Sequence, residues 1–191
     1  MERIPLKSAP KLFDAVIQEM QVALGGGLSW LNHVFGKAEK TQREYNGQRK
    51  FYVPSVYVGG GKYEEIVPDR RDWGNYAFFY LEEPQEVSDQ VRVMPYFQLY
   101  GDVCLVVWGD SRDIEAQDDR NLESIKSDIL QVLGGMKPTS GRFELERIWE
   151  QDKGVFEEYS IEENMGEYMM WPYFAFRFRM RVRCESGCVV S

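Results

Sequence analysis

The segment WPYFAFRFRMRVRC, residues 171–184, alternates apolar and basic side chains near the C-terminal end of a 191-residue chain. Because neighbouring side chains of a strand point to opposite faces, this alternation predicts a β-strand with two unlike faces. One face carries Phe174, Phe176, Phe178, Met180, Val182 and Cys184, and the other carries Arg177, Arg179, Arg181 and Arg183. The apolar face requires a core, whereas the arginine face requires water, carboxylates or a partner.

The segment from Phe143 to Glu150 offers carboxylates to that arginine face. Regular alternation places Phe143, Leu145 and Trp149 on one face, and Glu144, Glu146 and Glu150 on the other. If the two strands pair, glutamate and arginine meet in a cross-strand ladder in which each pair contributes about 0.2–1 kcal/mol. Alternatively, the arginines dock on an acidic partner or a neighbouring copy, because their forked donors suit such contacts. The candidate interface residues are therefore Arg177, Arg179, Arg181, Arg183, Glu144, Glu146 and Glu150.

Two helices are predicted from apolar residues that recur at helical spacing. The first begins near Ser8, a suitable N-cap, and ends at the glycine run 25–27. The second begins near Asp118 or Asp119 and runs to Leu133, where two glycines end it. Their apolar stripes are Leu12, Phe13, Val16, Ile17, Met20 and Leu24 in the first helix, and Leu122, Ile125, Ile129, Leu130 and Leu133 in the second.

Further strands are predicted where short apolar or aromatic runs lie between turn residues. These runs cover residues 51–58, 75–81, 95–100, 103–108 and 155–161, with a turn at Gly101-Asp102. Residues 36–50 are polar and predict an exposed loop or a frayed helix end, preceded by a short amphipathic piece around Trp30. The elements together predict an α+β fold, with a mostly antiparallel or mixed sheet and two main helices packed on one face. Residues 1–191 form a single domain in this interpretation, with an extended loop or hairpin insertion at about 36–75.

The composition narrows the classes of function. The net charge of −8 disfavours general nucleic-acid binding, because an acidic surface repels phosphate. The three cysteines are an odd number, which argues against a disulfide framework. Residues 1–5 are not followed by an apolar run, so they do not predict a secretory signal. No stretch approaches the roughly 18 apolar residues of a membrane span. We therefore expect a protein kept inside the cell, with no membrane partner.

Motifs for catalysis or metal binding are weak. The single histidine, His33, has no nucleophile motif near it, and Cys184 with Cys188 makes at most half of a zinc site. The glycine run 59–61 fails the phosphate-loop pattern, which requires a glycine where Val56 stands. We therefore predict no catalytic residues, no metal and no cofactor.

Two other functions stay open from the residues alone. Residues 144–167 hold nine acidic residues against two basic ones, so an enzyme that uses a carboxylate pair is one alternative. A second alternative is a non-catalytic module that binds a small ligand or a protein. In that case Trp73, Tyr76, Phe78 and Tyr80 would line an aromatic pocket.

The order of elements over about residues 95–184 resembles the tail-terminator proteins of tailed bacteriophages, especially their prophage versions. The resemblance lies in the strand Leu105 to Asp110, the helix Asn121 to Leu133, the segments FELE from residue 143 and VFEEYS from residue 155, and the final MWPYFAFRFRM from residue 170. This chain differs from the family in a longer 36–75 region and a more aromatic final strand.

The resemblance implies a structural protein without catalytic residues. Family members assemble into rings, typically hexamers, which cap the tail tube and join it to the neck proteins. The chain would then be made in the cytoplasm of a bacterial host and become part of a virion or tail-like particle.

Overall fold

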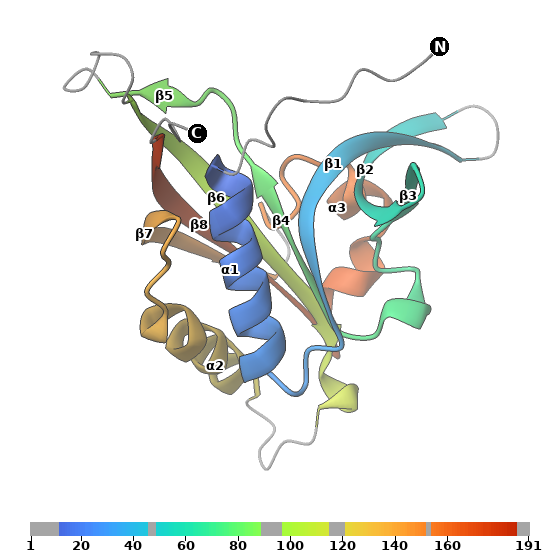
Figure 1. Cartoon of the computed structure of the whole chain (residues 1–191). Coiled ribbons are helices and arrows are strands. Elements are labelled where there is room, and N and C mark those ends of the chain that lie inside the picture. The colour runs from blue at the N-terminus through green and yellow to red at the C-terminus, as the bar shows by residue number, and fades with distance from the viewer. Residues whose placement is uncertain (1–11, 46–48, 89–96, 115–120, 152–153, 187–191) are drawn as a thin grey trace.

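The computed structural model of the chain describes residues 12–45, 49–88, 97–114, 121–151 and 154–186. Within these ranges, eight strands form one mixed sheet in the order β3-β2-β1-β4-β6-β8-β7, with β5 beside β6. The predicted α+β fold is confirmed (Figure 1). The strands are β1 (His33–Tyr45), β2 (Arg49–Gly59), β3 (Lys62–Glu65), β4 (Tyr76–Leu81), β5 (Glu86–Val87), β6 (Phe97–Asp110), β7 (Gly141–Glu150) and β8 (Tyr173–Ser186). The helices are α1 (Leu12–Gly27), α2 (Asn121–Gly135) and α3 (Ile161–Asn164), with 3-10 turns η1 (Arg71–Trp73), η2 (Ser111–Asp113) and η3 (Gly166–Met169).

The two long helices cover one face of the sheet, as predicted (Figure 1). Their buried residues are Phe13, Val16, Ile17, Met20 and Leu24 in α1, and Ile125, Ile129 and Leu133 in α2. They pack on the apolar face of β8, from Phe174 to Cys184, which is fully buried. The predicted helix starts at Ser8 and at Asp118 or Asp119 lie outside the described residues.

The central ladder of the sheet joins β6 to β8 without interruption, from Phe97 opposite Ser186 to Asp110 opposite Tyr173. The predicted turn at Gly101-Asp102 is therefore wrong, since both residues lie inside this ladder. Gly101 serves close packing instead: a Cβ atom there would lie 2.9 Å from Cζ of Phe13 on α1. The glycine lets α1 approach the sheet, and the chain stays extended.

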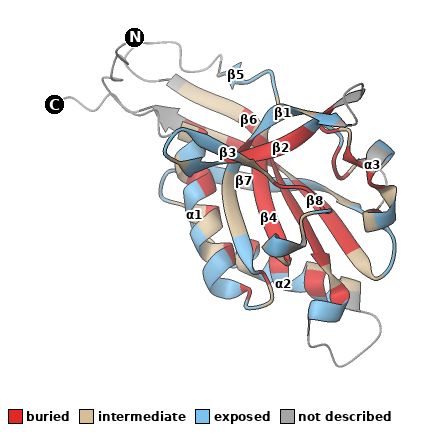
Figure 2. Cartoon of the chain, turned by 90° about the vertical axis from the view of Figure 1, so that its right-hand side faces the viewer, coloured by how far each residue is buried: buried red, intermediate tan, exposed pale blue. Residues whose placement is uncertain are grey.

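A second core fills the opposite face of the sheet. Strand β1 pairs in parallel with β4 only at its start, through His33, Val34 and Lys37, and then leaves β4 to pair antiparallel with β2. The second core includes Tyr76, Phe78 and Tyr80 of β4, Trp108 of β6, and Phe156 and Tyr159 of the segment 154–170. Figure 2 shows the buried strands at the centre of the molecule, between this segment and the helices.

Two predicted elements are wrong in this second layer. Residues 36–45 form part of β1, and their polar side chains find ion pairs across the layer, such as Lys40 with Glu158 at 2.7 Å. The segment 155–161 is not a strand but a series of turns that leads into α3, with Phe156 and Tyr159 as core residues. The region 36–75, expected to be a loop or hairpin insertion, contains most of β1 together with β2, β3 and η1.

Candidate functional site

The arginine face of β8 meets carboxylates within the same chain. Arg181 donates to Asp102 at 2.9 Å and to Glu86 at 2.5 Å, while Arg179 contacts Asp102 and lies 3.1 Å from Glu82. Burial alone would raise the pKa of Asp102, but the hydrogen bonds from Arg181 and Arg179 outweigh it and lower that pKa. Asp102 is thus held ionised between two arginines, as the central anion of an ion-pair network.

Asp102, Glu82 and Glu86 are partners that the sequence analysis missed. Because Gly101-Asp102 was interpreted as a turn, Asp102 was not assigned to a strand face beside the arginines. A longer alternation was present, however, because Leu99, Gly101 and Val103 share the helix face of β6, which leaves Asp102 on the arginine face. Glu82 and Glu86 lie after β4 in the chain, and no periodic pattern in the sequence identifies them as partners of the arginines.

A β-bulge in β7 rearranges the predicted glutamate face. Leu145 pairs with Met180 and Arg147 pairs with Arg179, so that Glu146 is an extra residue between them. Beyond the bulge the faces are exchanged: Trp149 packs against the second core, and Glu150 pairs with Lys126 of α2. The predicted common face of Glu144, Glu146 and Glu150 is therefore wrong for Glu150, and the common face of Phe143 and Trp149 is wrong as well. Glu144 lies opposite Arg181 in the ladder and is exposed, while Glu146 lies 3.9 Å from Arg179.

Arg177 is the most deeply buried charge of the described residues, with a side chain only 1% exposed. Its guanidinium stacks on Trp149, with 3.6 Å from Cζ to the ring centroid. It also donates to the Tyr80 hydroxyl at 3.0 Å and to Glu157 at 2.6 Å. Burial would lower the pKa of Arg177, but Tyr80 and Glu157 outweigh it and raise that pKa. Arg177 therefore fastens β8 to the segment 154–161.

The remaining arginine of the stripe, Arg183, is half-buried and lies opposite Arg142 of β7. The fold thus brings the four arginines together on one face and adds Asp102, Glu82 and Glu86 to them. Among the predicted glutamates, Glu146 reaches Arg179, whereas Glu150 lies on the other face of the sheet. Their role as an interface stays a prediction.

Cys104, Cys184 and His33 lie in structural environments. The Cys104 thiol is buried and donates to Glu82 at 3.1 Å, and burial raises its pKa far above the ordinary value. Burial also raises the pKa of Cys184 to about 11. Such thiols are weak nucleophiles at neutral pH. His33 lies 2.8 Å from the carbonyl oxygen of Trp73, and its ring packs on Phe35.

The described ranges contain no group of three or more His, Cys, Asp or Glu side chains that could hold a metal ion. Cys188, the second half of the considered zinc pair, lies outside these ranges. The aromatic residues considered for a ligand pocket belong to the second core or pack against it. Tyr76, Phe78 and Tyr80 are buried in the second core, and Trp73 packs against it.

An apolar groove of about 600 Å³ lies between the end of α2 and the start of β7, and we call it the α2–β7 groove. Its apolar lining includes Leu130, Leu133, Met136, Pro138, Phe143 and Leu145. Its charged lining residues are Lys137 and Arg142, of which Arg142 belongs to the arginine face of the sheet, opposite Arg183. The loop beside it is tied to α1 by Glu19, which accepts from the backbone N–H of Thr139 at 2.7 Å, and hydrogen bonds from Ser140 and Thr139 lower the pKa of Glu19. The groove is therefore a fixed feature of the surface.

A second exposed apolar site is the corner that precedes β8. Met170 and Trp171 are 66% and 62% exposed, although Met169 and Phe174 on either side are buried. We call these two residues the Met170–Trp171 corner. It follows the segment 154–170, whose residues Phe156, Tyr159 and Met169 pack in the second core on the face of the sheet opposite the helices.

Comparisons with known proteins add no family to this geometry. Neither a scan against protein-family models nor a search of curated proteins finds a match for the chain. In the described part of the chain, no helix has the length and apolar character needed to span a membrane. The candidate surfaces above therefore rest on the residues alone.

Proposed function

We propose that the chain is a non-enzymatic structural subunit that assembles with copies of itself into a ring, like the tail terminators that it resembles. In this role it would cap the tail tube of a phage or prophage particle and contact neck proteins. It would be made in the host cytoplasm before it joins the particle.

The observation that carries this proposal is the pair of separate exposed apolar sites on one chain. Head-to-tail assembly requires two different patches on each subunit, and a rotation that closes produces a ring. The α2–β7 groove lies on the helix side, where Leu145 is 40% exposed, and the Met170–Trp171 corner follows the segment that packs on the other side. Contiguous exposed apolar side chains are typical of protein–protein contact surfaces.

The chemistry of the ionisable groups supports a structural role. The pKa of Asp102 is lowered and the Cys104 thiol is buried, so neither suits proton transfer or nucleophilic attack near neutral pH. An aromatic binding pocket receives less support, because Tyr76, Phe78 and Tyr80 fill the core.

Light scattering after size exclusion, over a range of protein concentration, tests the proposal. A ring of six subunits would have about six times the chain mass of 22.4 kDa. Negative-stain electron microscopy of the same fraction should show closed rings. A chain that stays monomeric at every concentration would contradict the proposal.

A further inference from the structure

We infer that the Met170–Trp171 corner of one copy seats in the α2–β7 groove of a second copy. This inference rests on the proposed ring assembly and names the two surfaces that meet in it. The groove and the corner belong to the same chain, so no other protein is needed to supply the complementary half.

The corner is a rigid projection. The backbone N–H and the hydroxyl of Ser111 both donate to the carbonyl oxygen of Pro172, at 3.0 and 2.7 Å. The indole N–H of Trp108 donates to the carbonyl oxygen of Tyr168 at 2.9 Å, and the N–H of Tyr173 donates to that of Met170 at 2.9 Å. Because the backbone is braced on both sides, seating the corner costs little backbone entropy.

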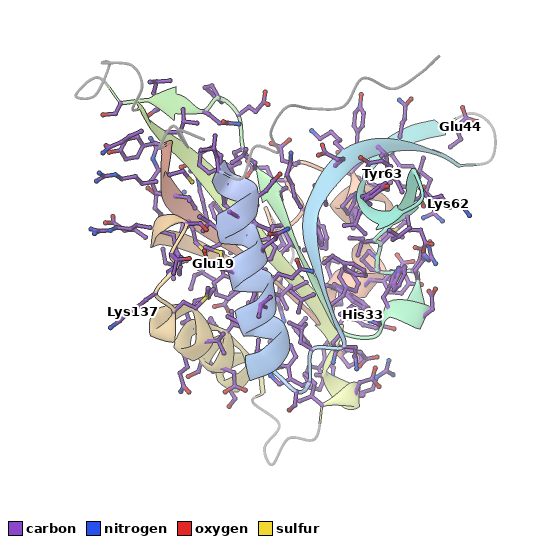
Figure 3. All side chains as sticks on the ribbon, viewed as in Figure 1. Glu19, His33, Glu44, Lys62, Tyr63 and Lys137 are labelled. Carbon is purple, nitrogen blue, oxygen red and sulfur yellow. The ribbon has the colours of Figure 1, made fainter. Side chains whose placement is uncertain are left out.

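The groove suits such a projection in shape and chemistry. Its volume of about 600 Å³ has room for one large aromatic and one thioether side chain. Tryptophan is a frequent anchor of protein interfaces, and methionine adapts to irregular apolar surfaces. Lys137, at the edge of the groove, points away from the body of the molecule, as Figure 3 shows.

The charges of the two surfaces are complementary. Glu163 and Glu167 lie close to the corner in sequence, are exposed, and have no ion-pair partner among the described residues. Lys137 lines the groove and has no ion pair in that part of the chain, and neither has Arg142 on the neighbouring edge strand, opposite Arg183. On a chain of net charge −8, the unpaired Lys137 at the groove favours an acidic partner surface, and Glu163 and Glu167 beside the corner supply one.

The positions of the two surfaces define the kind of contact. The groove is formed by α2 and β7 and the corner by the residues that precede β8, so the contact joins unlike patches. Each copy then keeps one free groove and one free corner, until a ring closes.

Cysteine cross-linking between two variants tests the contact directly. Trp171→Cys and Leu145→Cys are made separately in a Cys188→Ser background, then mixed and oxidised gently. We expect a covalent dimer in the mixture and none with either variant alone. Trp171→Cys mixed with Tyr63→Cys, an exposed site on β3, is the matched control and should not cross-link.

A charge exchange provides the second test. Glu163→Lys with Glu167→Lys, and separately Lys137→Glu with Arg142→Glu, should each weaken self-association about tenfold or more. An equimolar mixture of the two double variants should recover association between unlike chains. Oligomers that form without the cross-link and without a response to charge would overturn the inference but leave the ring proposal intact. A monomer in every sample would overturn both.

Discussion

The arginine face of β8 and the α2–β7 groove hold their charges differently. On β8, Arg177, Arg179 and Arg181 meet carboxylates inside the chain. At the groove, Lys137 has no ion pair within the described residues, and neither has Arg142 next to it on β7. The difference shows that a basic stripe in a sequence does not by itself mark an interface. Unpaired charges beside exposed apolar side chains are the better marker, because their charge is not yet neutralised.

The largest expected effect comes from the buried end of the arginine face. Arg177→Ala removes the stacking on Trp149 and leaves the Tyr80 hydroxyl without its donor, and should lower the free energy of unfolding by about 3 kcal/mol. Urea denaturation followed by Trp fluorescence measures this change. Arg147→Ala is the matched control, since Arg147 is exposed and its guanidinium lies 5.4 Å from the centre of the same ring. An equal loss in both variants would contradict the special role of Arg177.

Asp102→Asn should have the next largest effect, about 1.5 kcal/mol, because it removes the carboxylate shared by Arg179 and Arg181. Glu144→Gln, on the other side of Arg181 in the sheet, should change the unfolding free energy by less than about 0.5 kcal/mol. Chemical denaturation of the two variants compares the carboxylates directly. If Glu144→Gln lowered the free energy of unfolding more than Asp102→Asn, the main carboxylate partner of these arginines would lie on β7 and not on β6.

The same carboxylate predicts a dependence on pH. The pKa of Asp102 in the folded chain lies below its ordinary value of 3.8, so its contribution is fully present above that value. The contribution is lost as the pH falls through the lower, folded pKa. We expect the unfolding free energy of the Asp102→Asn variant to fall less steeply with acid than that of the wild type. Parallel curves of unfolding free energy against pH for the two proteins would show that Asp102 does not contribute to the loss of stability in acid.

A smaller effect tests the β-bulge. Because the bulge turns Glu150 towards α2, a double-mutant cycle between Glu150→Gln and Lys126→Met should give a coupling of about 0.5 kcal/mol. The corresponding cycle between Glu150→Gln and Arg177→Met should give none. Coupling to Arg177 instead would contradict the bulge, because it would place Glu150 on the arginine face, as regular alternation predicts.

The smallest effect on stability is expected in the groove. Lys137→Glu with Arg142→Glu should shift the unfolding free energy by less than about 0.5 kcal/mol, because neither residue has an ion pair to lose. Thermal unfolding of the variant at a dilution where both proteins are monomeric isolates this quantity. A large loss of stability would show that these charges serve the fold and would remove the contrast with β8.

The sequence predicted those elements whose own pattern is decisive. The apolar stripes of α1 and α2 and the alternation of β8 predict helices on one face of a sheet, and the structure confirms this. Strand β1 was missed because its polar side chains, such as Lys40 and Arg43, have partners only in distant segments. Such tertiary compensation leaves no local pattern in the chain.

The candidate surfaces were less predictable than the fold. The bulge at Glu146 is a single extra residue, and it exchanges the faces of Trp149 and Glu150. The groove arises where α2 meets β7, and Ser111 of a distant segment holds the carbonyl of Pro172, next to Trp171. These features depend on contacts between distant segments, whereas alternation along one strand is visible in the sequence.

Light scattering at equal concentration should distinguish the wild type from the Lys137→Glu, Arg142→Glu variant most directly. We expect a ring mass for the wild type, about six times 22.4 kDa, and a shift towards the monomer for a variant that unfolds at the same temperature. Identical monomer masses for both proteins at every concentration would contradict this expectation.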